Sequence, residues 1–301
     1  MSDRLTKALD QILEGDTQLL ESAGFARVTT TGARTPSGIF EWEDRLEIRG
    51  DGTIRQTTYR SFADGPGQEP GVYELKKDRA YLLNLFTALR DAGLDALPAG
   101  RVEPADVAIR LSAVAGGASV EWAVAAADHM SLRPVQPLLN LFVPLTLQLL
   151  DHPVMTLGLD CSAPAQAKVG SARLNIGLRF RNAGSRGYWL AHPAKIVEDG
   201  RFEHVGLQYG IKPVVRDDIM PRPIQILRAT LQPAGTDAPD LIWVGGHSET
   251  PVNCTAQINF PEAGRYFLRA AFSTYAGGIS ASSQPRFVGG VFSKDVEVTV
   301  T

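Results

Sequence analysis

The chain has 301 residues, of which 44% are hydrophobic and 21% charged, with a formal net charge of −3. These values are ordinary for a globular protein, and the length exceeds that at which one core usually stops growing, so we expect two domains. Residues 1–153 carry 15 basic and 21 acidic side chains (−6), and residues 154–301 carry 15 and 12 (+3). This asymmetry is too small to indicate nucleic-acid or membrane binding.

The first elements combine one helix with three strands. Apolar residues in 3–23 follow a helical period that weakens at Gly15-Asp16, and Gly24 suits a helix C-cap. Composition predicts a loop at 29–38. Three strands are then expected, the first two joined by a turn at Gly50-Asp51-Gly52: 40–48, 54–59 and 72–75.

A second helix should begin after Asp78, a good N-cap, and end at Gly93-Leu94. Two strands around Gly116-Gly117 follow, 107–111 and 120–124. Pro134 opens a last helix to about Leu150, kinked or split at Pro144 and apolar nearly all round. We expect this helix to be buried on several sides, between domains or between subunits.

This order of elements predicts an α+β domain over 1–153, an antiparallel sheet with helices on one face. A strand pair, the helix over 81–94, Asp106-Val-Ala-Ile-Arg-Leu-Ser and a Gly-Gly hairpin loosely resemble emfourin-type inhibitor domains of metallopeptidases. The resemblance covers about 39–150 and rests on element order alone, so no inhibitory residue is transferred.

The residue pattern of the C-terminal half, 154–301, predicts an all-β sandwich. In Phe260–Phe272, Pro261 and Gly264 mark a corner, after which Tyr266, Leu268, Ala270 and Phe272 alternate with residues of the other face. This stretch resembles the penultimate strand of immunoglobulin-like and fibronectin-III-like sandwiches, in which a tyrosine hydroxyl bonds back to the corner. The resemblance assigns that role to Tyr266. Leu268 stands where antibody-type domains have a cysteine, so the resemblance implies a sandwich without that disulfide. It also implies that Trp189 is the core tryptophan of the sandwich. The other expected strands are 155–161, 173–180, 187–193, 205–211, 226–231, 241–245, 252–260 and 287–300.

The termini and cysteines suggest the cytoplasm. The N-terminus is polar and amphipathic without the apolar core of a signal peptide, and Leu138–Leu150 is too short to span a bilayer. We therefore expect reduced thiols at Cys161 and Cys254, with a bridge between them as the alternative.

Known catalytic and metal-binding motifs are absent from the sequence: there is no phosphate-binding Gly-rich loop, no Gly-x-Ser-x-Gly, no His-Glu-x-x-His and no Cys-x-x-Cys. His247, Glu249 and Cys254 form the best metal-like group but match no ligand spacing, so we predict neither metal nor cofactor. Glu41, Glu43 and Glu47 alternate with Arg45 and Arg49, which favours a solvated ladder of charges over a hydrolytic carboxylate pair.

The most concentrated positive group is Arg173, Arg179, Arg181 and Arg186. A solvated face or contact with the acidic first domain explains it, and a protein interface is the functional alternative. From this group and the missing catalytic motifs we predict a non-enzymatic protein-binding module of the inhibitor, immunity or adaptor type, with no nucleic-acid or membrane partner. A hydrolase with a dispersed active site and an accessory sandwich stays open, as does a structural subunit that uses the apolar helix.

Overall fold

A computed structural model describes residues 2–34, 40–59, 69–94, 107–125, 135–193, 196, 204–211, 227–233, 239–274 and 287–301. This described part is mostly β-strand, and its α-helices fall within residues 2–150. It divides into two compact units, each with its own hydrophobic core. The first unit contains the described residues up to Val154 except Glu69 and Pro70, which belong with Met155–Thr301 to the second unit.

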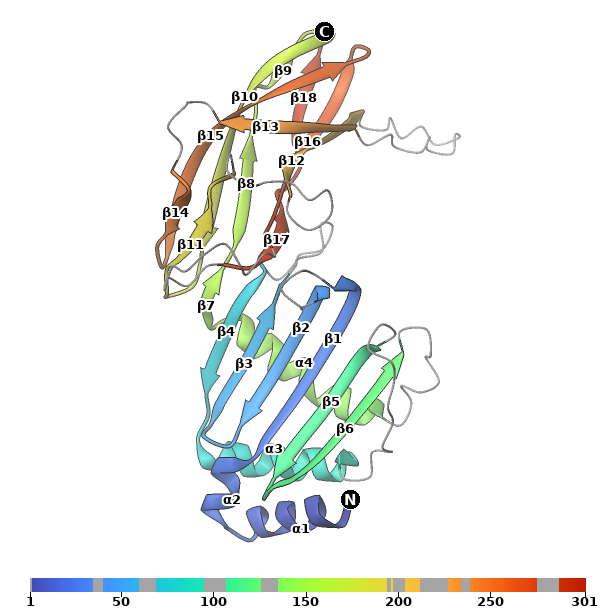
Figure 1. The fold of residues 1–301 in the computed structure, drawn as a ribbon, viewed down its shortest axis with the longest axis vertical. Coiled ribbons are helices and arrows are strands. Elements are labelled where there is room, and N and C mark those ends of the chain that lie inside the picture. Colours follow the sequence, from blue (N-terminus) through green and yellow to red (C-terminus); the bar gives the residue numbers. More distant parts are fainter. Residues whose placement is uncertain are drawn as a thin grey trace. The chain divides into compact units, whose positions relative to one another are not determined.

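A single seven-stranded sheet organises the first unit, in the order β6-β5-β1-β2-β3-β4-β7 (Figure 1). Neighbouring strands from β6 to β4 are antiparallel. The central β1 is hydrogen-bonded to β2 on one side and to β5 on the other. The strands are β1 (Gly24–Arg34), β2 (Phe40–Arg49), β3 (Thr53–Thr58), β4 (Gly71–Lys76), β5 (Val107–Ala115), β6 (Ala118–Ala125) and β7 (Pro153–Thr156), which leads into the second unit.

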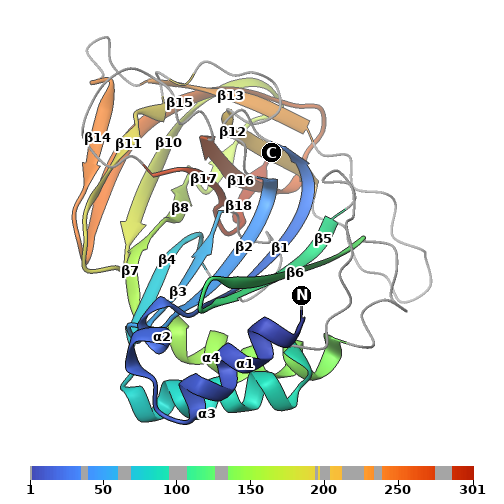
Figure 2. The ribbon, with the colours of Figure 1, turned by 60° about the horizontal axis from the view of Figure 1, so that its bottom comes forward.

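Helices cover one face of this sheet (Figure 2). Helix α1 buries Leu5, Leu9 and Ile12 because these positions recur on one side of a 3.6-residue period. Phe25 of β1 stacks on Phe142 of α4 with ring centroids 4.9 Å apart. The sheet and the helices thus share one core. The helices are α1 (Ser2–Leu13), α2 (Thr17–Ser22), α3 (Arg79–Asp91) and α4 (Gln136–Leu150).

Helix α4 is continuous through Pro144 and buries one side only. The opposite side leaves Val143 57% and Leu147 62% exposed. The expectation that α4 is buried on several sides is therefore wrong for the described structure, and its use as a contact between subunits stays a prediction. The buried side consists of Leu138, Phe142, Leu145 and Leu149.

Strand β1 occupies residues for which the sequence predicts a helix end and a loop. Its residues Thr29–Arg34 fall in the predicted loop, and Gly24 is its first residue rather than a helix cap, which Ala23 provides. Phe25 is 2% exposed, and β-branched threonines fit a strand that has neighbours on both sides. The end of the predicted loop, 35–38, lies outside the described residues.

Local signals for caps and turns are confirmed. The Asp78 carboxylate accepts a hydrogen bond from the Tyr81 N–H at 2.8 Å and begins α3. Gly93 follows α3 with φ +89°, a left-handed conformation that favours glycine. Gly116 and Gly117, with φ of +54° and +73°, form the turn between β5 and β6.

The second unit contains two layers of strands around one core. Strand β13 pairs with β12 through its first half and with β15 through its second half, so it passes from one layer to the other. Phe180 of β10 meets Phe272 of β16 edge to face, with centroids 5.1 Å apart, so the layers pack against each other. The arrangement is sandwich-like, and the predicted inward residues Leu174, Ile176 and Leu178 are buried.

Most predicted strands of this half are present. The first is interrupted at Leu157, and the last is split around Ser293, whose hydroxyl oxygen accepts a hydrogen bond from the Ala270 N–H at 2.9 Å. The strands are β8 (Gly158–Ser162), β9 (Gln166–Ala167), β10 (Gly170–Asn182), β11 (Tyr188–Ala191), β12 (His204–Ile211), β13 (Leu227–Pro233), β14 (Leu241–Val244), β15 (Ser248–Phe260), β16 (Gly264–Thr274), β17 (Gly289–Phe292) and β18 (Val296–Val300).

The predicted tyrosine contact at the corner before β16 is confirmed. Tyr266 is 1% exposed, and its hydroxyl donates a hydrogen bond to the Glu262 carbonyl at 3.0 Å. The Tyr266→Phe variant should lower the free energy of unfolding by about 1 kcal/mol, because one partly buried hydrogen bond is lost while the ring still fills its site. Urea denaturation measures this change, and an unchanged midpoint would show that the bond contributes nothing.

Candidate binding surface

The two-stranded sheet of β11 and β14 has an outward face without a polar side chain. Trp189 lies opposite Trp243, and Ala191 lies opposite Leu241. We call these four residues the tryptophan face. An antiparallel sheet that covers a core usually has polar residues on its outer side, so an all-apolar outer side marks a candidate contact surface. The alternate residues face the core: Tyr188, Leu190, Ile242 and Val244.

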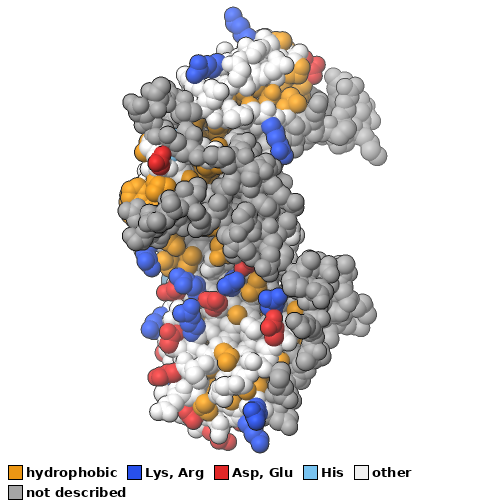
Figure 3. Space-filling model, in the orientation of Figure 1, with side chains coloured by type: hydrophobic (Ala, Val, Ile, Leu, Met, Phe, Trp, Pro, Cys, Tyr) orange, Lys and Arg blue, Asp and Glu red, His pale blue; other side chains and the backbone are white. Residues whose placement is uncertain are grey.

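Two tryptophan rings dominate this surface. The centroids of Trp189 and Trp243 are 5.2 Å apart and their planes are inclined by 57°. Trp243 remains 48% exposed, and hydrophobic side chains gather over β11 and β14 in Figure 3. A Cβ atom on Gly187 would lie 2.3 Å from Cζ2 of Trp243, so the indole rests directly on that backbone. The position of Trp243 is therefore fixed by a glycine.

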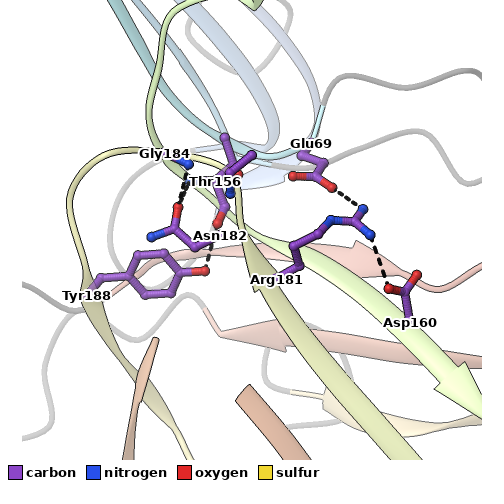
Figure 4. A network of polar contacts seen from close by, with 8 residues as sticks. Glu69, Thr156, Asp160, Arg181, Asn182, Gly184 and Tyr188 are labelled. Atoms are coloured by element: carbon purple, nitrogen blue, oxygen red, sulfur yellow. Dashed lines mark hydrogen bonds and ion pairs between the residues drawn. The ribbon is translucent and has the colours of Figure 1, made fainter. Parts of the chain in front are cut away.

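Asn182 holds together the loops next to the tryptophan face, and Figure 4 shows its contacts with Thr156 and Gly184. Its side chain is buried and makes four hydrogen bonds, which is its full capacity. The Oδ1 atom accepts from the N–H groups of Thr156 at 3.0 Å and Gly184 at 2.9 Å. The Nδ2 group donates to the carbonyls of Arg186 at 2.9 Å and Gly245 at 3.0 Å. Arg186 comes just before β11 and Gly245 just after β14, so one side chain joins the ends of both strands.

Neighbouring contacts hold the same loops. The buried hydroxyl of Tyr188 donates to the Thr156 carbonyl at 2.7 Å, and this burial raises the pKa of Tyr188. The N–H of Ala183 donates to the Thr156 hydroxyl oxygen at 2.9 Å. The N–H of His247, a residue with φ +51°, donates to the Gly184 carbonyl at 2.9 Å. The loops at 183–187 and 245–248 are therefore bonded to each other and to the strand ends.

The four predicted binding arginines do not form one free positive patch. Arg173 donates to the Thr255 hydroxyl at 3.3 Å, and Arg179 pairs with Glu249 at 3.3 Å. Arg181 lies between two carboxylates, Glu69 at 2.5 Å and Asp160 at 3.1 Å (Figure 4). The hydrogen bond that Arg181 donates to the Glu69 carboxylate is the main cause of the raised pKa of Arg181. Arg186 is exposed and forms no ion pair with a residue that the structure describes. Their use in binding stays a prediction.

Arg45 and Arg49 of β2 each pair with a glutamate of the same strand, so these pairs do not form the expected cross-strand ladder. Arg45 contacts Glu43 at 2.9 Å and Arg49 contacts Glu47 at 3.5 Å. Glu43, however, is only 5% exposed, so the expectation of a fully solvated ladder is wrong at that residue.

The cysteines are free thiols in a hydrophobic setting. Burial raises the pKa of both Cys161 and Cys254 to about 11, which disfavours the thiolate. They flank β10 on opposite sides, Cys161 opposite Leu178 and Cys254 opposite Ile176. The strands on either side of β10 are two strand spacings apart, so the Cα atoms of the two cysteines are separated by roughly 9.5 Å. A disulfide does not span this distance, so the alternative of a bridge is wrong.

The metal-like group identified in the sequence is not assembled. Glu249 is exposed and Cys254 is 2% exposed, because the two residues face opposite sides of β15. Within the described ranges, no three His, Cys, Asp or Glu side chains are grouped to hold a metal ion. In the same residues, no helix is long and apolar enough to cross a bilayer.

The Gly187→Ala variant should displace Trp243, because the added methyl group would overlap its ring. We expect weaker near-UV circular dichroism and loss of the coupling between the two indoles in the far-UV spectrum. Gly24→Ala is the matched control, since its Cβ would meet its nearest neighbour at an ordinary 3.4 Å. Identical spectra for Gly187→Ala and the wild type would contradict this account of the ring position.

Comparisons with known proteins leave the family open. No protein-family model and no curated protein matches the chain. The resemblance to emfourin-type inhibitors therefore stays a prediction.

Several solved structures share a limited likeness. Spo0M, a sporulation control protein from Bacillus subtilis, is 11% identical over 48% of this chain and 49% of its own, with a TM-score of 0.27. A CARDB domain from Pyrococcus furiosus, solved with di-metal ions, is 11% identical over 49% of this chain and 90% of its own, with a TM-score of 0.22. AvmM, which catalyses macrocyclization in alchivemycin A biosynthesis, is 12% identical over 48% of this chain and 88% of its own, with a TM-score of 0.23. The chain thus spans about half of Spo0M, and at these TM-scores none of the likenesses identifies its fold or function.

Proposed function

We propose that this chain is a non-enzymatic protein-binding module, of the inhibitor, immunity or adaptor type, that contacts its partner through the tryptophan face. The observation that carries the proposal is an outer surface without a polar side chain, on which Trp243 is 48% exposed beside the half-buried Trp189. We also propose that the sandwich is immunoglobulin-like and forms a second domain after an α+β domain, with its boundary near 153–154. The corner contact of Tyr266 supports that assignment.

Tryptophan is the residue type most suited to such a contact. It buries a large apolar area while losing little side-chain freedom, and it is enriched among the residues that contribute most to binding energy. Trp243 already rests on Gly187 in the free chain, and Asn182 fixes the ends of both strands. Binding therefore costs little further ordering of the surface, which favours affinity.

A structural subunit is the second candidate, and helix α4 favours it. Its sequence contains no charged residue, and Val143 and Leu147 are both more than half exposed. Such a stripe suits packing against another helix. The tryptophan face outranks it because its aromatic side chains contribute more energy per contact than valine and leucine.

Selection of a random-peptide phage library on the immobilised chain tests the proposal. We expect enriched peptides that bind the wild type and fail to bind a Trp189→Ser/Trp243→Ser double variant that folds normally by circular dichroism. Peptides that bind both proteins equally, or no enrichment at all, would contradict the proposal. Binding of an oligosaccharide on a glycan array, lost in the same variant, would replace the protein partner with a carbohydrate.

A further inference from the structure

At the end of β11 and β14 nearer Trp189 and Trp243, the adjoining loops carry positive charge alone, whereas at the other end Asp240 precedes Leu241. The loop between β10 and β11 reads Ala-Gly-Ser-Arg-Gly at 183–187, and the turn after β14 reads Gly-Gly-His-Ser at 245–248. Arg186 and His247 are their only ionisable side chains. The tryptophan face itself has no charge, so Arg186 supplies the permanent charge at the end nearer the two tryptophans.

The side chain of Arg186, in the loop after β10, differs from the three arginines of β10 in lacking a partner among the described residues. Arg179 and Arg181 are paired with carboxylates, and Arg173 with a hydroxyl. Arg186 is exposed and makes no ion pair with any residue in the described part of the chain. Its guanidinium is the one in this group that has no described side-chain partner, so all five of its N–H donors are available to an acceptor from outside.

The backbone of Arg186 is held at the edge of the tryptophan face. Its carbonyl accepts from Asn182 Nδ2 at 2.9 Å, and its N–H nitrogen lies 3.3 Å from where a Cβ of Gly246 would be. The next residue, Gly187, is the one on which Trp243 rests. These contacts use main-chain atoms of Arg186, so its side chain can be replaced without removing them.

We infer that the partner presents a carboxylate to Arg186, next to apolar side chains that pack on Trp189 and Trp243. This inference rests on the proposed function and adds the chemistry of the partner: an acidic side chain beside an apolar one. An Arg–carboxylate pair at the border of an apolar contact orients the partner and accelerates its association. The apolar contact provides most of the affinity.

The test uses peptides enriched on the wild-type chain, resynthesised with Asn for each Asp and Gln for each Glu. We expect the amide versions to bind about tenfold more weakly, with most of the loss in the association rate. Arg186→Glu should weaken binding of the unmodified acidic peptide by about the same factor, and the acidic and amide peptides should then bind this variant equally. Arg186→Lys should keep most of the binding. Arg173→Glu is the matched control, since it changes the net charge equally at an arginine that does not adjoin the tryptophan face.

Two results separate this inference from the proposed function. Peptides that lose binding in Trp243→Ala but bind equally as acids and amides would overturn the inference and leave the tryptophan face as the binding surface. Peptides that depend on Arg186 but not on Trp243 would overturn the proposed function. Equal weakening by Arg186→Glu and Arg173→Glu would assign the effect to net charge and also overturn the inference.

Discussion

Replacing Asn182 with alanine is expected to lower the free energy of unfolding by about 3 kcal/mol or more. The amide makes four hydrogen bonds, and its removal leaves two N–H groups and two carbonyls without their partner. Each buried polar group left unsatisfied costs about 1–3 kcal/mol, and water that enters the space recovers part of this. Urea denaturation, followed by circular dichroism, measures the loss.

Asn175→Ala is the control for this prediction. Asn175 lies on the same strand, β10, but is exposed, so its removal should change the stability by less than about 0.5 kcal/mol. Equal effects of the two substitutions would show that the buried amide does not organise the loops. The Asn182→Ala variant should also bind selected peptides more weakly, because the ends of β11 and β14 lose their common attachment.

Replacing Trp243 with alanine should weaken binding of a selected peptide by about 2 kcal/mol or more, which is roughly 30-fold. The substitution removes the more exposed ring of the tryptophan face and also the support it gives to Trp189. The stability should change little by comparison, since Trp243 lies outside the core. Isothermal titration calorimetry measures the affinity directly.

Val169→Ala is the matched control for Trp243→Ala. Val169 is also an exposed apolar residue of the second unit, at 47%, but it is not part of the tryptophan face. We expect its replacement to leave the affinity within about twofold of the wild type. Equal losses in both variants would indicate non-specific adhesion of the peptide to apolar surface.

Local chemistry made much of the fold predictable. Asp78 begins a helix because its side chain satisfies a free N–H, and the sequence alone shows this. Leu174 to Phe180 alternate because one side of their strand is buried. Strand β1 is not predictable in the same way, since Thr29, Thr30 and Thr31 resemble a loop until β2 pairs with all three and β5 pairs with Thr29.

The candidate site was harder to predict, for physical reasons. Residues 188–191 and 241–244 are apolar at every position, which is equally typical of a strand buried on both faces. The resemblance to immunoglobulin-like sandwiches implies a core position for Trp189, and this is wrong: Tyr188 and Leu190 are buried while Trp189 faces outward beside Trp243. Only the register of two strands far apart in the sequence places the rings together.

The arginine group shows the same limit. Its positive charge was visible in the sequence, but Glu69, which neutralises Arg181, is 112 residues away along the chain. Charge that is concentrated in sequence is therefore not concentrated in the folded unit.

The most direct test of the tryptophan face is NMR of the indole N–H groups during titration with a selected peptide. The chain contains four tryptophans, so four signals are expected. Trp42 and Trp122 belong to the first unit, and Trp189 and Trp243 to the tryptophan face. We predict that the signals of Trp189 and Trp243 shift or broaden while those of Trp42 and Trp122 stay unchanged. Saturable binding that leaves Trp189 and Trp243 unaffected would contradict the account.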